Sequence, residues 1–340
     1  MTIHVRRHGL SGALLAACAT VLMACLASGA AAQSKIKVGY MPIAEETPKF
    51  VATDRGIFKK HDLDVELVRF ESGPDMGTAL LGGSIQVGMI GTPGLISAAV
   101  AGRPLVAIVD NGRNKMDASG YEYYTGIVVL DESPIRTIGD LKGKRLAVNV
   151  LKANSEAQTV LQVARWNKEN PARQVDLGKD VRLVELPFGS MPAALERGMV
   201  DAASMIEPFS TQLRQARKVR VVASVEYAMP QWPVSFGVVR RDFGAKNVDI
   251  LKSYRQAWIE SVLWIRQNPD AAKAIMQKYT GVSPEVASKI ILPDWSEDIK
   301  ATLRSTEQVM DGMVAGGMLS KKANLNDVII QDLGTLAKDK

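Results

Sequence analysis

Short apolar segments of strand length alternate with helix-start and helix-stop residues along this chain. This alternation restricts its fold more than any other feature. Typical signals are Thr47-Pro48 at a helix start and Gly56 at a helix end. In the first third, strands are predicted at 36–40, 65–68, 85–90 and 105–109. Strands that alternate with helices form a mostly parallel sheet covered by helices. The sequence therefore predicts an α/β fold.

A second series of the same kind follows, with a helix start at Asn154-Ser155. Its strands are predicted at 145–150, 181–186, 200–206 and 220–224. The two series match at an offset of 115 residues, which takes Met76 to Met191 and Pro93 to Pro208. Two α/β units of similar architecture are predicted from this match.

The N-terminus has the pattern of a secretory signal. Arg6 and Arg7 precede a stretch without Asp, Glu, Lys or Arg, which lies between His8 and Lys35 and ends in small residues. This pattern predicts a signal peptide at 1–32, cleaved after Ala32. Two alternatives stay open. The stretch is almost long enough for an uncleaved membrane anchor, and lipid attachment at Cys18 or Cys25 would tether the chain to a membrane.

Removal of 1–32 would leave few residues suited to catalysis. Without Arg6 and Arg7, 40 Lys+Arg stand against 36 Asp+Glu, a net charge of +4. No cysteine would remain, and His61 would be the single histidine. A thiolate nucleophile, a thiolate metal site and a Ser–His–Asp triad are therefore not expected. The small charge excess does not predict nucleic-acid binding. We expect no enzyme activity, no metal and no cofactor.

The carboxyl ends of the predicted strands are the expected ligand site. Ligands of open α/β sheets bind there, where the following helices present free N–H groups. Two units facing each other would form a cleft suited to a small anion. The helix starts in question are Thr47-Pro48, Ser72-Gly73-Pro74, Thr92-Pro93, Asn154-Ser155, Ser190-Met191-Pro192 and Glu207-Pro208.

Four segments carry a resemblance to a known family. They are residues 54–68 (DRGIFKKHDLDVELV), 79–88 (ALLGGSIQVG), 133–148 (SPIRTIGDLKGKRLAV) and 193–209 (AALERGMVDAASMIEPF). The chain resembles the periplasmic solute-binding proteins of ABC transporters in the nitrate/sulfonate/taurine group, which includes thiamine-pyrimidine binders. The resemblance covers nearly all of residues 35–338, although its motifs concern the fold and do not identify a ligand.

The resemblance implies the type II periplasmic-binding-protein fold, with two α/β lobes, mixed mostly parallel sheets, a hinge and a helical C-terminal region from about residue 247. Lobe 1 is expected to comprise 33–130 and 234–340, and lobe 2 to be inserted as 131–233. Crossings are placed near 130–132 and 226–233. We expect strands 126–130 and 234–239 to lie side by side in lobe 1.

Nine residues are expected to contact the ligand. Glu207 precedes Pro-Phe at a strand end, where the family has an acidic residue, and ligand contact and helix capping are equally favoured for it. Tyr123 belongs to an aromatic stretch, Tyr121-Glu122-Tyr123-Tyr124, that would wall the pocket or pack at the hinge. Trp232 would stack on the ligand or simply pack. The full set is Tyr40, Gly91, Thr92, Asn111, Tyr123, Asn154, Ser155, Glu207 and Trp232.

By resemblance, the expected function is a monomeric periplasmic receptor of an ABC importer. It would trap a small organic anion, an alkyl or aryl sulfonate or a taurine-like molecule, and present it to a permease at the inner membrane. The alternatives are a binder of a pyrimidine or an aromatic carboxylate, and a periplasmic sensor domain. A pyrimidine-synthase-like enzyme is disfavoured, because that family needs cysteine and histidine residues absent beyond residue 61.

Overall fold

The computed structural model describes Met1, residues 33–115, Ala118, Tyr123 and residues 126–339. The signal predicted within 1–32 therefore lies outside the described residues, apart from Met1. So do Tyr121, Glu122 and Tyr124. Ser34–Lys340 form one unit.

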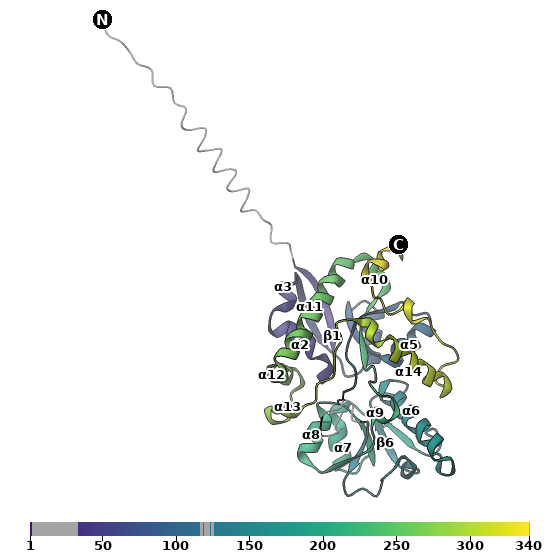
Figure 1. The fold of residues 1–340 in the computed structure, drawn as a ribbon. Coiled ribbons are helices and arrows are strands. Elements are labelled where there is room, and N and C mark those ends of the chain that lie inside the picture. The colour runs from purple at the N-terminus through teal and green to yellow at the C-terminus, as the bar shows by residue number, and fades with distance from the viewer. Residues whose placement is uncertain (2–32, 116–117, 119–122, 124–125, 340) are drawn as a thin grey trace. The chain divides into compact units, whose positions relative to one another are not determined.

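The first sheet has five strands in the order β2-β1-β3-β10-β4. They are β1 (Ser34–Tyr40), β2 (Leu63–Arg69), β3 (Val87–Gly91), β4 (Leu105–Asp110) and β10 (Ser235–Arg240). β1 is parallel to β2 and β3, whereas β10 is antiparallel to β3 and β4. Several helices lie around β1 (Figure 1). The helices that belong with the first sheet are α2 (Thr47–Asp54), α3 (Ile57–Lys60), α4 (Gly73–Leu81), α5 (Thr92–Val100), α10 (Arg241–Lys246), α11 (Val248–Gln267) and α12 (Pro269–Thr280).

The second sheet repeats this arrangement in the order β7-β6-β8-β5-β9. Its strands are β5 (Gly126–Leu130), β6 (Arg145–Val148), β7 (Arg182–Glu185), β8 (Ala202–Met205) and β9 (Val219–Ala223). Its helices are α6 (Asn154–Glu169), α7 (Met191–Glu196), α8 (Phe209–Ala216) and α9 (Val225–Ala228). β3 and β8, which correspond at the offset of 115, each occupy the third place in their sheet. Two mixed sheets with flanking helices confirm the predicted α/β class.

The C-terminal third is largely helical, as predicted. α11 ends at Gln267 and α12 begins at Pro269, and Ser283 accepts a hydrogen bond from the N–H of Val286 at the start of α13 (Pro284–Lys289). α14 (Leu303–Ala315) packs against α5 (Figure 1). The chain before and after α14 contains short 3₁₀ turns where longer helices were expected. The 3₁₀ turns of the chain are η1 (Ala44–Glu46), η2 (Ile138–Leu141), η3 (Pro171–Arg173), η4 (Phe188–Ser190), η5 (Ile299–Thr302), η6 (Leu325–Asp327) and η7 (Leu333–Asp339).

The described helices include none with both the length and the apolar character needed to cross a membrane.

The predicted pairing of 126–130 with 234–239 is wrong. β5 lies in the second sheet, antiparallel to β8 and β9, and β10 lies in the first sheet. The chain thus passes from the first sheet to the second between β4 and β5, and not near 130–132. A strand that enters a sheet from the cleft must run antiparallel to strands that end at the cleft. β5 and β10 are the two strands in this position. The lobe boundaries proposed from the sequence move accordingly.

The crossing segments are held together by a short three-stranded ladder. Gly112 accepts a hydrogen bond from the N–H of Val234 (2.8 Å), and Asn114 donates its N–H to the carbonyl of Trp232 (2.7 Å). Arg113 pairs through its backbone with Asp294 and makes a 2.6 Å ion pair with that side chain. Three stretches of chain, around Arg113, Pro233 and Asp294, therefore meet at one place.

Gly126 is the residue on which the entry of β5 depends. Its φ is +85°, and a Cβ there would lie 2.3 Å from the carbonyl oxygen of Ala223. We predict that Gly126→Ala lowers the free energy of unfolding by about 2–4 kcal/mol, combining backbone strain and overpacking. Gly143→Ala is the control, since φ is +74° but no atom lies within 4 Å of the added Cβ. Urea titrations of both variants test this. Equal losses would show that the overlap with Ala223 does not matter.

Candidate functional site

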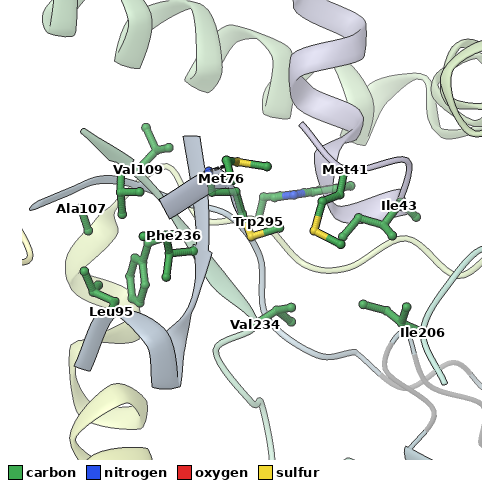
Figure 2. Packing of buried hydrophobic residues seen from close by; sticks show 14 of the residues in the cluster. Met41, Ile43, Met76, Leu95, Ala107, Val109, Ile206, Val234, Phe236 and Trp295 are labelled. Carbon is green, nitrogen blue, oxygen red and sulfur yellow. Dashed lines mark hydrogen bonds between the residues drawn. The ribbon is translucent and has the colours of Figure 1, made fainter. Parts of the chain in front are cut away.

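A cavity of about 510 Å³ lies between the two sheets, a size typical of small-molecule sites. Most of its wall is apolar. Met41, Ile43, Ile206 and Val234 come from distant parts of the chain and line it together; Figure 2 shows their side chains on neighbouring segments. The other large apolar side chains of the wall are Leu81, Met89, Ile90, Leu105 and Phe188.

The second sheet contributes the beginning of α6 to the wall. Asn154 and Ser155 line the cavity, and the residue before them, Ala153, gives the helix no side-chain cap. Trp232 is buried and donates its Nε1–H to Asn154 Oδ1 (3.2 Å), while Ser155 Oγ accepts the N–H of Asn149 (2.9 Å). These bonds orient Asn154, and α6 begins at the cavity wall with no side-chain cap on its first N–H groups. A helix of 16 residues with an uncapped N-terminus favours an anionic group at that end.

The first sheet approaches α6 closely at Gly91. A Cβ at this position would lie 3.0 Å from the Cβ of Asn154, so a side chain here would crowd Asn154. Gly91 is also the residue before α5, which has no side-chain cap either. The N-termini of two helices, one from each side, therefore open on the same cavity.

A buried polar network lies at the inner end. Ser235 Oγ donates to Glu45 Oε1 (3.1 Å), and Tyr123 Oη donates to Glu45 Oε2 (3.2 Å). Asn111 Nδ2 donates to Ser235 Oγ (3.0 Å) and to Glu46 Oε1 (3.3 Å). Glu45 and Ser235 line the cavity, so they are the members that a ligand would meet.

The second acid of the network is paired. Lys49 Nζ lies 2.5 Å from Glu46 Oε2 and donates to the carbonyl of Gly39 (3.0 Å), and both charged side chains are fully buried. Burial raises the pKa of Glu46, and the positive charge of Lys49 opposes this shift. A buried charge needs such a partner, because its desolvation is costly.

Glu45 has no cation of its own. Burial raises its pKa to about 8, and the neighbouring charge of Glu46 raises it further, against the hydrogen bonds from Ser235 and Tyr123. At neutral pH this carboxyl group is therefore mostly protonated, and the inner wall carries no net negative charge at that point. The protein thereby avoids repelling an anion held in the cavity.

Two cations border the cavity. Arg103 and Lys152 line it, are exposed at the surface, and have no ion pair or side-chain hydrogen bond with another described residue. No group of three or more His, Cys, Asp or Glu within the described residues is arranged to hold a metal.

Three of the nine predicted residues lie in the cavity wall: Gly91, Asn154 and Ser155. Asn111, Tyr123 and Trp232 lie directly behind it and hydrogen-bond to wall residues, as described above. The structure thus brings six of the nine together, two of them at the wall of α6.

The other three predicted residues lie elsewhere. Tyr40 packs edge-to-face on Phe50, with ring centroids 5.4 Å apart. The hydroxyl of Thr92 donates to the carbonyl of Pro233 (2.6 Å) and does not cap α5.

Glu207 accepts hydrogen bonds from the N–H (3.1 Å) and hydroxyl (2.7 Å) of Thr211 and pairs with Arg214 (3.0 Å). It therefore satisfies the first turn of α8, which is the capping role. Of the six helix starts proposed for the ligand site, only the one at Ser72 has a hydroxyl that accepts a hydrogen bond from its own helix, at the N–H of Asp75.

Sequence reasoning missed Glu45 and Ser235. Glu45 follows the first strand, within Met41-Pro42-Ile43-Ala44-Glu45-Glu46, and two acids in so apolar a segment are the signal that could have found it. Ser235 opens β10 and carries no signal of its own.

Comparison with known proteins gives a consistent result. The model of the NMT1-like family matches residues 29–279. A candidate aliphatic sulfonates-binding protein of Bacillus subtilis (strain 168) is 23% identical over 330 residues, covering 93% of each chain. The taurine-binding periplasmic protein of Escherichia coli (strain K12) is 26% identical over 238 residues, covering 69% of this chain and 68% of its own.

The same fold occurs in solved structures. The alkanesulfonate-binding protein SsuA of Xanthomonas axonopodis pv. citri, bound to MOPS, superposes with a TM-score of 0.70 at 19% identity, covering 89% of this chain and all of that one. The periplasmic aliphatic sulphonate binding protein SsuA of Escherichia coli superposes with a TM-score of 0.68 at 21% identity, covering 88% and 98%. The predicted type II fold is confirmed.

The raised pKa of Glu45 predicts a pH-dependent stability. The folded-state pKa of about 8 exceeds the ordinary 4.5, so the folded state binds the extra proton and stability falls as pH rises between these values. Glu45→Gln cannot bind this proton. Between roughly pH 5 and 8 its free energy of unfolding should therefore fall by about 1.4 kcal/mol less per pH unit than that of the wild type.

Urea unfolding at pH 5.5 and 7.5 measures this difference. The exposed Glu66→Gln is the control and should follow the wild type. If the free energy of unfolding fell equally in the wild type and in Glu45→Gln between these pH values, a protonated Glu45 would be contradicted.

Proposed function

The chain belongs to the NMT1-like family, which confirms the resemblance carried by its motifs, and from this premise we propose that it is a periplasmic solute-binding receptor of an ABC importer. Its ligand is an organic anion with an apolar body, of the alkyl- or aryl-sulfonate class. Relatives named for sulfonate and taurine binding support this class.

One observation carries the proposal: a mostly apolar cavity ends at an uncapped helix N-terminus. The N–H groups of α6 and the amide of Asn154 would bind the charged group, and Lys152 would add a cation at the rim. Met41, Ile43, Phe188 and the other apolar side chains would cover the remainder of the molecule. Glu45, held neutral, would leave the anion unopposed.

The apolar wall favours an alkyl or aryl tail over the smaller candidates. Nitrate and taurine have little or no apolar surface, so they would leave this wall facing water or bury a polar group without a partner. A pyrimidine is less well supported, since Phe188 is the one aromatic residue among the described lining residues.

The receptor is proposed to bind without chemical change. Residues 33–340 contain no cysteine, and their one histidine, His61, lies 2.9 Å from Glu260. Neither residue lines the cavity.

Closure about the hinge is the proposed working motion. The ladder at Gly112–Asn114 would let the two sides rotate as units, and ligand contacts from both sides would favour the closed form. That form would be presented to the permease. A periplasmic sensor would use the same cavity without transport.

Ligand binding by purified protein tests the proposal. We predict that butanesulfonate or benzenesulfonate raises the melting temperature, and that nitrate and taurine raise it less at equal concentration. Asn154→Ala should weaken sulfonate binding about 10- to 100-fold, because a hydrogen bond to a charged group is lost. Isothermal titration calorimetry measures the loss.

Two lysines at opposite ends of α6 test the contribution of a nearby positive charge. Lys152→Ala should weaken sulfonate binding about fivefold or less, whereas Lys168→Ala, at the other end of α6, should not. Tighter binding of nitrate or taurine than of any sulfonate with an apolar body, or no binding of such a sulfonate, would overturn the proposal.

A further inference from the structure

The cavity does not end at the cleft between the sheets. It continues between α4 and α5, which both pack on β3 and β10. We call this part the α4–α5 arm. Its lining residues are Gly73, Pro74, Gly77, Thr78 and Leu81 of α4, Gly94, Ser97 and Ala98 of α5, and Ala101, Arg103 and Leu105 beyond it.

Small side chains keep the arm open. Gly77 and Gly94 flank Ile90 of β3: a Cβ at Gly94 would lie 2.8 Å from Ile90 Cγ2, and one at Gly77 would lie 3.5 Å from Ile90 Cδ1. Glycine inside a helix is unfavourable relative to alanine. A side chain at Gly94 would collide with Ile90, so this glycine lets α5 pack closely on β3, whereas a Cβ at Gly77 would make only an ordinary contact.

The arm is long and partly lined by large apolar side chains, and an arginine lies at its far end. α4 has nine residues, so the arm runs roughly 12 Å along it. Ile90 and Leu105 form its floor and Leu81 stands near its end. Arg103, which has no ion pair with another described residue, lies beyond them. Helix α14 packs against α5.

We propose that the α4–α5 arm holds the tail of the ligand, which is therefore a long-chain alkyl or arylalkyl anion. The charged group lies at the start of α6 and the chain extends from Gly91 along Ile90 toward Leu81. This inference rests on the proposed function and adds the length of the ligand to it. Continuity of the arm with the cleft is the reason for assigning it to the same ligand.

Chain length is the variable that tests the arm. Straight-chain sulfonates from ethane- to decanesulfonate are titrated into the wild-type protein by calorimetry. Each methylene that enters the arm should tighten binding about fourfold, and the gain should stop once the arm is filled. Equal affinity along the series, with the short sulfonates still bound, would overturn the arm and leave the proposed function standing. No binding of any sulfonate would overturn both.

Two variants that narrow the arm provide the structural test. Ala98→Leu should abolish the gain with chain length, so that decanesulfonate binds no more tightly than the short sulfonates. Ser97→Leu, at a less buried position of the same wall, should act in the same direction and guards against misfolding of the first variant. The control is Ala79→Leu, the same change on α4 outside the arm's lining. A chain-length gain that survives both narrowing variants would contradict the inference.

Discussion

The structure depends on the chain passing between two sheets, each of which receives one strand from the side of the cleft. β5 and β10 enter in this way and run antiparallel to their neighbours, while the other strands of each sheet end at the cleft. The helices that follow those strands must then begin there. This is why α5 and α6, from different sheets, both begin at one cavity; the N–H of Thr92 at the start of α5 is taken by the carbonyl of Val234, so α6 offers the uncapped N-terminus. Gly126 makes the arrangement possible, since a side chain there would collide with the carbonyl of Ala223, and Gly91 leaves room for the close approach of Asn154.

Electrostatics make the cavity suitable for an anion. The interior holds two adjacent acids, and the protein treats them differently: Glu46 is paired with Lys49, whereas Glu45 is kept protonated by burial. Tyr123 and Ser235 complete the hydrogen bonding of Glu45. Positive charge near the cavity comes from helix N-termini and from the exposed cations Arg103 and Lys152. Because these cations are exposed, their desolvation cost is small. The wall between them is left apolar.

Much of the fold could be predicted from sequence patterns, because the start and end of each helix and strand depend on residues nearby in the sequence. The helix starts at Gly73 and Asn154 and the repeat at an offset of 115 are examples. The pairing of β5 is non-local, so its apolar composition could not reveal which sheet it joins. Predicted caps failed where a distant acceptor was available, as for Thr92 and Pro233. The arm at Ile90 depends on the spacing of α4 and α5, which composition does not contain, and Glu45 gains its raised pKa only from the surrounding fold.

A crystal structure of the protein with octanesulfonate tests the central claim most directly, since anomalous scattering locates the sulfur atom. We expect the sulfur at the start of α6, beside Asn154 and Gly91, with the chain between α4 and α5. Sulfur beside Arg103 with the chain pointing into the cleft, or a ligand outside this cavity, would contradict it.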